Sequence, residues 1–167
     1  MYLASAILLA INLLIPAAAS CGGMDPPVPG PVVQGFEPVG RYAGHWGVDY
    51  HAVAGTAVTA GQAGTVSFAG VVAGNRTITI DHGGGVKSSY SYLSSVSVEV
   101  GERIRRGAAI GLSGRAHGTD AVHFSVRVGG TYVDPNRLFS CSLLDPAAAL
   151  RLVPVSRRSR SSAYPVG

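Results

Sequence analysis

The sequence has few charged residues, few cysteines and no amphipathic stretch of helical length before Leu143. Only 13% of its 167 residues are charged, whereas 47% are hydrophobic, and this balance argues against an intrinsically disordered chain. Two cysteines with no neighbouring partner cysteine are too few for a cysteine-based zinc cluster. Basic and aromatic residues are not interleaved, so we expect no nucleic-acid partner.

Glycine is abundant, and it separates short apolar runs along the chain. There are 23 glycines, a pattern typical of an all-β protein with many tight turns. The sequence predicts one domain, a small antiparallel β-sandwich or barrel-like core with extended tails, and we expect a monomer. Expected strands cover residues 32–36, 48–51, 65–72, 76–81, 86–93, 109–112 and 122–128, and residues 37–44 are expected to form a loop.

The two ends of the chain differ from its centre. Residues 3–15 are almost all apolar and are followed by small residues up to Ser20, which predicts a signal peptide over residues 1–20, although no Lys or Arg precedes the apolar run. The stretch is short for a membrane span, which needs about 20 apolar residues. Residues 21–31 read as a Pro/Gly-rich linker, and residues 141–167 as a basic tail with four arginines.

The first cysteine admits two interpretations. Cys21 follows Ala-Ala-Ser and precedes two glycines, which resembles a lipoprotein cleavage box and predicts a lipid anchor. Alternatively, Cys21 pairs with Cys141 in a disulfide, as an even cysteine count in an exported chain allows. Either way, we expect an exported protein that is extracellular, in the cell wall, or anchored on the outer face of a membrane.

A histidine and an aspartate lie four residues apart at the start of an expected strand. In His45-Trp46-Gly47-Val48-Asp49, the glycine would let both side chains approach one point. Strand alternation puts Asp49 and His123 on faces opposite the apolar ones, which makes His123 a candidate third ligand. Two histidines and a carboxylate with an open fourth position are typical of a catalytic Zn²⁺ site, although His-x-x-x-Asp alone is more often a surface hydrogen bond.

The motifs around these residues occur in a specific order. His45, Gly47 and Asp49 fit a His-x-Gly-x-Asp pattern, and further matching segments are residues 55–60, 64–66, 80–83, 100–111, 123–124 and 132–135. As a set they resemble the lysostaphin/LytM-type zinc metallopeptidases, bacterial enzymes that cut peptide cross-links in peptidoglycan. The resemblance implies a peptidase-like domain over residues 32–140, with His45, Asp49 and His123 as the Zn²⁺ ligands.

Two positions depart from the family pattern. The family usually has His-x-His where this chain has Ala121-Val122-His123, and Tyr-x-His-Leu where this chain has Tyr90-Ser91-Tyr92-Leu93. Both usual catalytic histidines are therefore absent while the implied ligands remain. Tyr92 and His117, the latter in a Gly-flanked loop, are candidate replacements, although the simpler interpretation of His117 is an exposed loop residue.

These departures leave the function open between three hypotheses. We expect an exported zinc metalloendopeptidase-like domain that acts on or binds peptidoglycan peptides, with hydrolysis weak or lost, because acid–base groups contribute about 10²–10⁴-fold. The alternatives are a fully active endopeptidase with substitute acid–base residues, and a noncatalytic domain that binds envelope material or regulates an envelope hydrolase. Trp46 and Tyr90 are candidate substrate contacts.

Overall fold

The computed structural model describes residues 23–41 and 43–139. The expected signal peptide (residues 1–20), Cys21, Cys141 and the basic tail lie outside the described residues, so those predictions stay predictions. Within the described part, no helix is long and apolar enough to cross a membrane.

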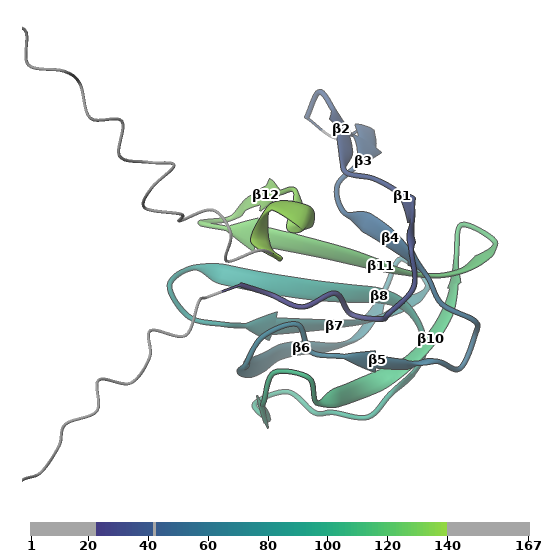
Figure 1. Ribbon diagram of the computed structural model, residues 1–167. Coiled ribbons are helices and arrows are strands. Elements are labelled where there is room, and N and C mark those ends of the chain that lie inside the picture. Colours follow the sequence, from purple (N-terminus) through teal and green to yellow (C-terminus); the bar gives the residue numbers. More distant parts are fainter. Residues whose placement is uncertain (1–22, 42, 140–167) are drawn as a thin grey trace, which may run out of the picture.

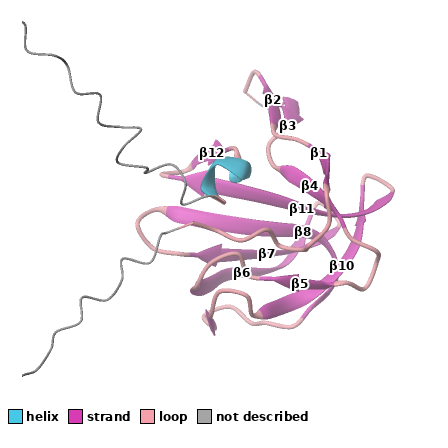
Figure 2. Ribbon diagram, in the orientation of Figure 1, coloured by secondary structure: helices cyan, strands magenta, loops and turns pink. Residues whose placement is uncertain are grey.

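The fold is all-β and antiparallel, as predicted (Figures 1 and 2). One large sheet has the order β1-β4-β11-β10-β8-β7-β6-β9, with β5 on β10 and β12 on β11, and β2 and β3 form a separate hairpin. The strands are β1 Val32–Gln34, β2 Glu37–Val39, β3 Ala43–His45, β4 Val48–His51, β5 Ala57–Thr59, β6 Gly64–Val72, β7 Asn75–Asp81, β8 Val86–Val96, β9 Arg103–Ile104, β10 Ala109–Ala116, β11 Thr119–Val128 and β12 Thr131–Val133. A 3-10 helix, η1 (Pro135–Leu138), follows them.

The sheet curls because β8 pairs with both arms of the β10–β11 hairpin. The first half of β8 pairs with β11, and its second half pairs with β10. Beyond the point where β8 and β11 separate, β10 and β11 pair with each other. This arrangement gives the barrel-like core and places β11, β8, β7 and β6 side by side (Figure 1).

The seven expected strands are all present, but the chain has more strands than predicted. The expected loop at residues 37–44 contains β2 and the start of β3, and β5, β9 and β12 were also missed. Each of these strands has two or three residues, too few for a period of two to be recognised. Their pairing partners, not their own sequences, make them strands.

Strand phase was predicted correctly where the strands are regular. Val48 and Tyr50 point into the core from β4, and Val122, Phe124 and Val126 do so from β11, with at most 3% of each residue exposed. Side chains at the intervening positions point to the opposite face. That face of β4 and β11 is therefore available for polar residues.

The segment expected as a linker packs against the domain instead. Met24 and Val28 are buried in the core, the Met24 amide donates to the Leu138 carbonyl, and the Thr59 amide donates to Pro27. Asp25 forms an ion pair with Arg106. The apolar residues between the prolines have a core to bury against, so this part of residues 21–31 belongs to the domain.

Strand β8 contains a bulge at Tyr92. Tyr92 has a φ of 62°, and between Arg76/Leu93 and Ile78/Tyr90 the pairing with β7 shifts register. A bulge re-aims side chains, so Tyr90 and Tyr92 do not share a face. Tyr90 is fully buried against Phe124, and the prediction that it contacts substrate is wrong.

A chain of polar groups crosses the core beside Tyr90. The Gly61 amide donates to the Tyr90 hydroxyl, which lies 3.0 Å from Ser88 Oγ, and Ser88 Oγ lies 2.7 Å from His82 Nε2. The Ala63 carbonyl accepts from His82 Nδ1 at 2.9 Å. Burial lowers the pKa of His82 from its ordinary value of 6.5, so at neutral pH the ring is uncharged and carries its proton on Nδ1, which faces the Ala63 carbonyl.

We predict that His82 makes folding stability fall as the pH drops below 6.5. In that range the unfolded chain binds a proton at His82 more readily than the folded chain does, so acid favours unfolding. Urea unfolding between pH 8 and pH 5 should show a steeper loss in the wild type than in His82→Gln. All other titrating groups are common to both proteins, so equal slopes would contradict the assignment.

Candidate metal centre

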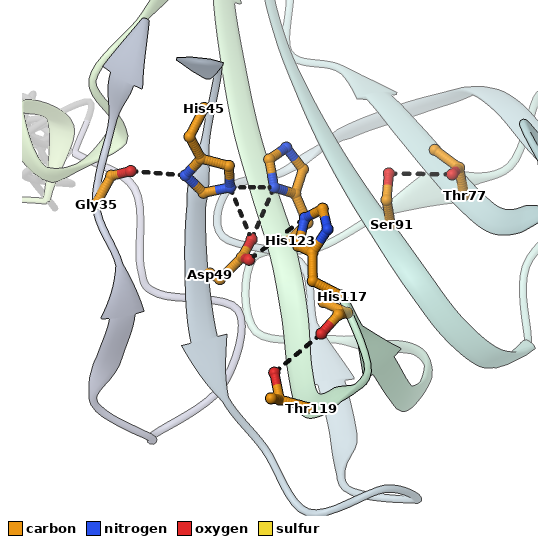
Figure 3. Close-up of polar contacts among 9 residues, drawn as sticks. Gly35, His45, Asp49, Thr77, Ser91, His117, Thr119 and His123 are labelled. Carbon is orange, nitrogen blue, oxygen red and sulfur yellow. Dashed lines mark hydrogen bonds and ion pairs between the residues drawn. The ribbon is translucent and has the colours of Figure 1, made fainter.

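Three side chains converge at one end of the β4–β11 pair. His45 ends β3, Asp49 lies in β4, and His123 lies opposite Asp49 in β11. His45 Nε2 lies 3.1 Å from Asp49 Oδ1 and 3.0 Å from His123 Nδ1, and His123 Nδ1 lies 2.8 Å from Asp49 Oδ1 (Figure 3). The three potential ligand atoms thus form a nearly equilateral triangle.

The orientation of His45 is fixed by the backbone. Its Nδ1 lies 2.6 Å from the Gly35 carbonyl oxygen, which can only accept, so Nδ1 carries the proton. The lone pair of Nε2 then points at Asp49 and His123. Metal-binding histidines are commonly held this way, with the second ring nitrogen donating to a carbonyl or carboxylate.

The triangle is slightly smaller than one face of a zinc coordination tetrahedron. With metal–ligand bonds of about 2.0–2.1 Å, tetrahedral ligands lie roughly 3.3–3.4 Å apart. The chemistry of the three atoms also suits a cation. The His45 lone pair and the Asp49 carboxylate both accept, and His123 Nδ1 can supply only one proton between them. These residues therefore fit a divalent metal with a fourth position open.

The Asp49 carboxylate is held in its charged form. Only 3% of Asp49 is exposed, and this burial alone would raise its pKa. The hydrogen bond from His123 and the charges of the surrounding imidazoles outweigh burial and lower the pKa of Asp49. A buried carboxylate that stays ionised is ready to bind a cation without first losing a proton.

Gly47 is needed for the close approach of β4 and β11. A Cβ at this position would lie 2.5 Å from His123 Cε1 and 2.7 Å from the Phe124 carbonyl oxygen. The backbone oxygen cannot move away as a side chain could. The glycine in the His45–Asp49 segment is therefore a steric requirement of the site, although the group that it makes room for is His123 in β11.

A third histidine faces the site from the β10–β11 hairpin. His117 and Gly118 have φ values of 51° and 82°, the positive pair of a type I′ turn. His117 Nε2 lies 3.8 Å from Asp49 Oδ2, and ligand atoms of His45, Asp49 and His117 lie within 4.8 Å of one another (Figure 3). The triangle that His123 forms with His45 and Asp49 is tighter than the one that includes His117. His117 therefore lies beside the tighter triangle, and 54% of the His117 side chain is exposed.

The residues that replace the usual histidines differ in position. Ala121 is fully buried and offers no polar group. The Tyr92 ring, turned by the bulge, lies 5.1 Å from the His117 ring and 6.4 Å from the His123 ring between centroids. Both candidate replacements named from the sequence, Tyr92 and His117, are thus brought to the open side of the triangle.

The site opens into a groove with a volume of about 720 Å³. Hydroxyl groups on β7 and β8 line it and bond in cross-strand pairs, Thr77 with Ser91 at 3.0 Å and Thr79 with Ser89 at 2.9 Å. Trp46 and Tyr132 also line it, with ring centroids 5.8 Å apart. Trp46 therefore occupies a position from which it can contact a ligand in the groove.

Most of the groove could not be predicted from the sequence. The polar faces of β7, β8 and β11 follow from alternation with buried neighbours, and this signal marks Thr77, Thr79, Ser89, Ser125 and Arg127 as facing away from the core. Only strand pairing shows that these faces are continuous. Tyr132 carried no signal, because β12 has only three residues.

Comparison with known proteins bears on the family and the fold. The sequence profile of peptidase family M23 matches residues 43–135, more than half of the chain. A similar curated protein is the DD-carboxypeptidase/endopeptidase Mpg of Neisseria meningitidis, 36% identical over 95 residues. The match covers 54% of this chain and 22% of Mpg, so this chain spans only a fraction of that relative.

Solved structures of similar proteins have the same fold. A zinc containing peptidase from Vibrio cholerae matches with a TM-score of 0.60 and 28% identity, over 68% of this chain and 39% of that chain. Lysostaphin, the antimicrobial peptidase from Staphylococcus simulans, matches with a TM-score of 0.59 and 27% identity, over 66% of this chain and 50% of that chain.

We predict that Gly47→Ala lowers zinc affinity by about 10–100-fold, the usual effect of disturbing the surroundings of a metal ligand. The new Cβ displaces the His123 ring from the triangle. Competition with a chromophoric chelator measures the affinity. Gly35→Ala is the control, because a Cβ there meets nothing within 4 Å and the carbonyl that holds His45 remains. Unchanged affinity in Gly47→Ala would contradict the geometry.

Proposed function

The chain belongs to peptidase family M23, and from this we propose that it is a zinc-dependent endopeptidase acting on peptidoglycan peptides, with His117 as its proton-transfer group. The observation that carries the proposal is the triangle of His45 Nε2, Asp49 Oδ1 and His123 Nδ1, with sides of 2.8–3.1 Å and an imidazole on its open side. Export, expected from the leader, would bring the chain to this substrate.

The proposal assigns the ligand role to His45, Asp49 and His123. Zinc bound there would polarise a peptide carbonyl and make water a better nucleophile near neutral pH. The hydrogen bond of His45 to Gly35 and the ionised state of Asp49 keep two ligands in the required form. The groove would lead an extended peptide past these residues, and Trp46 is one of the residues that line it.

His117 is the group in reach that can move a proton. Its ring lies 6.2 Å from the His45 ring between centroids and its Nε2 faces Asp49. A neutral imidazole there would take a proton from the attacking water and return it to the leaving amine. The Tyr92 hydroxyl, on the same side, would donate a hydrogen bond to the oxyanion that develops on the carbonyl.

A noncatalytic role is the second candidate, and one observation favours it. Ala121 is buried and the usual Tyr-x-His position holds Tyr92, so neither family histidine is present. If the hairpin histidine does not transfer protons, the domain would bind zinc and wall peptides, or an envelope hydrolase, without cleaving. Hydrolysis separates the two candidates.

We predict that the zinc-loaded protein releases peptides from purified peptidoglycan and that His117→Ala lowers the rate about 100-fold or more, the contribution of a general acid–base group. Zinc content should remain near one ion per chain in this variant. Released peptides are measured by chromatography and mass spectrometry. In His123→Ala, by contrast, both zinc and release should be lost, because the ligand triangle is broken.

His51→Ala is the matched control, since His51 is exposed and lies two residues beyond Asp49. Its rate should equal that of the wild type. A wild-type rate in His117→Ala would remove His117 from the mechanism. Stoichiometric zinc in the wild type without any released peptide would favour the noncatalytic candidate.

A further inference from the structure

An arginine lies in the groove without a carboxylate partner. Arg127 lines the groove from β11, and its Cζ lies 5.5 Å from the centroid of the Tyr132 ring. Among the ion pairs of the described residues, with N–O distances up to 4.0 Å, none includes Arg127. The ring supports one face of the guanidinium and leaves its N–H donors to the groove.

A second cation lies directly across from this arginine. Arg127 in β11 pairs in register with Lys87 in β8, and both line the groove. Like charges at directly opposite positions destabilise a sheet. Lys87 is offset by Asp81, 3.3 Å away, whereas no ion pair within residues 23–41 and 43–139 offsets the charge of Arg127.

The rest of the groove adds no negative charge. Of the described residues that line it, the charged or titratable side chains other than tyrosines are Lys87, Arg127, His45, His117 and His123. Asp49 lies beneath the histidines, with 3% exposed. Among the described lining residues, the groove thus holds a guanidinium that no ion pair offsets and no exposed carboxylate, and this balance suits an anionic ligand.

We propose that Arg127 is a carboxylate-binding subsite that selects peptides with a free carboxylate about four residues from the scissile bond. Guanidinium groups bind carboxylates through two parallel hydrogen bonds. This inference rests on the proposed function, because the position of the subsite is given by its distance from the proposed zinc ligands.

The strand sets the spacing. His123, Ser125 and Arg127 occupy alternate positions of β11 and face the groove. Four residues of β-strand span about 13 Å, and an extended peptide covers about 3.3–3.6 Å per residue. A peptide lying along β11 with its scissile carbonyl at the histidines would thus place its fourth residue at Arg127.

The test compares binding of synthetic peptidoglycan stem peptides to the zinc-loaded full chain. One peptide keeps all its carboxylates, and the others carry a carboxamide at one carboxylate in turn. We expect one amidation to weaken binding about tenfold or more, as loss of a hydrogen-bonded charge pair does. The sensitive position identifies the carboxylate that Arg127 binds, either the C-terminus or an internal side chain.

Arg127→Gln should bind the free-carboxylate peptide about tenfold less tightly and should no longer distinguish it from the sensitive amide. Arg127→Lys should retain part of the preference, because the charge remains and the bidentate geometry is lost. Arg103→Gln is the control, an exposed arginine in β9 that does not line the groove. It should keep the full preference.

Two outcomes would overturn the subsite: a wild type that binds all peptides equally or none, and an Arg127→Gln variant that keeps the preference. Cleavage is scored separately. Cleavage without the carboxylate preference would leave the endopeptidase proposal standing and remove the subsite. A preference that depends on Arg127 without any cleavage would support the subsite and contradict the endopeptidase proposal.

Discussion

The register that places Asp49 opposite His123 is the constraint on which the rest of the site depends. This one pairing of β4 with β11 sets the triangle of His45, Asp49 and His123. Gly47 permits the pairing because it has no side chain. A Cβ at that position would meet both the His123 ring and a backbone oxygen. A shift by one residue would turn the ligands into the core. The apolar residues that alternate with them, Val48 and Phe124, resist such a shift because they would then be exposed.

Two side chains reach the site from places where the backbone is irregular. Tyr92 is turned toward the site by a bulge, and His117 is brought there by a type I′ turn. Residues with positive φ are uncommon outside glycine, and they occur often where a strand must re-aim a side chain. The absence of an imidazole at Ala121 thus coincides with the presence of one on the adjoining hairpin.

The groove connects the metal centre to the rest of the sheet. The hydroxyl groups and aromatic rings that line it come from segments far apart in the sequence. Arg127 lies on the same face of β11 as His123. Rigid strands hold these groups at fixed spacing, which would give a peptide a defined position relative to His45, Asp49 and His123. Catalysis and selectivity would then be determined by one continuous surface.

The sequence alone indicated the all-β class and the regular strands, because the alternation of apolar and polar residues is a local property of a chain. The order of its motifs also marked His45, Asp49 and His123 as candidate metal ligands. It could not show that Tyr90 is buried while Tyr92 faces the site, since a bulge depends on the pairing of β8 with β7 and β10. The convergence of His117 on Asp49 likewise required the tertiary structure. Contacts between residues 68 positions apart depend on how the sheet curls, and no local pattern records that.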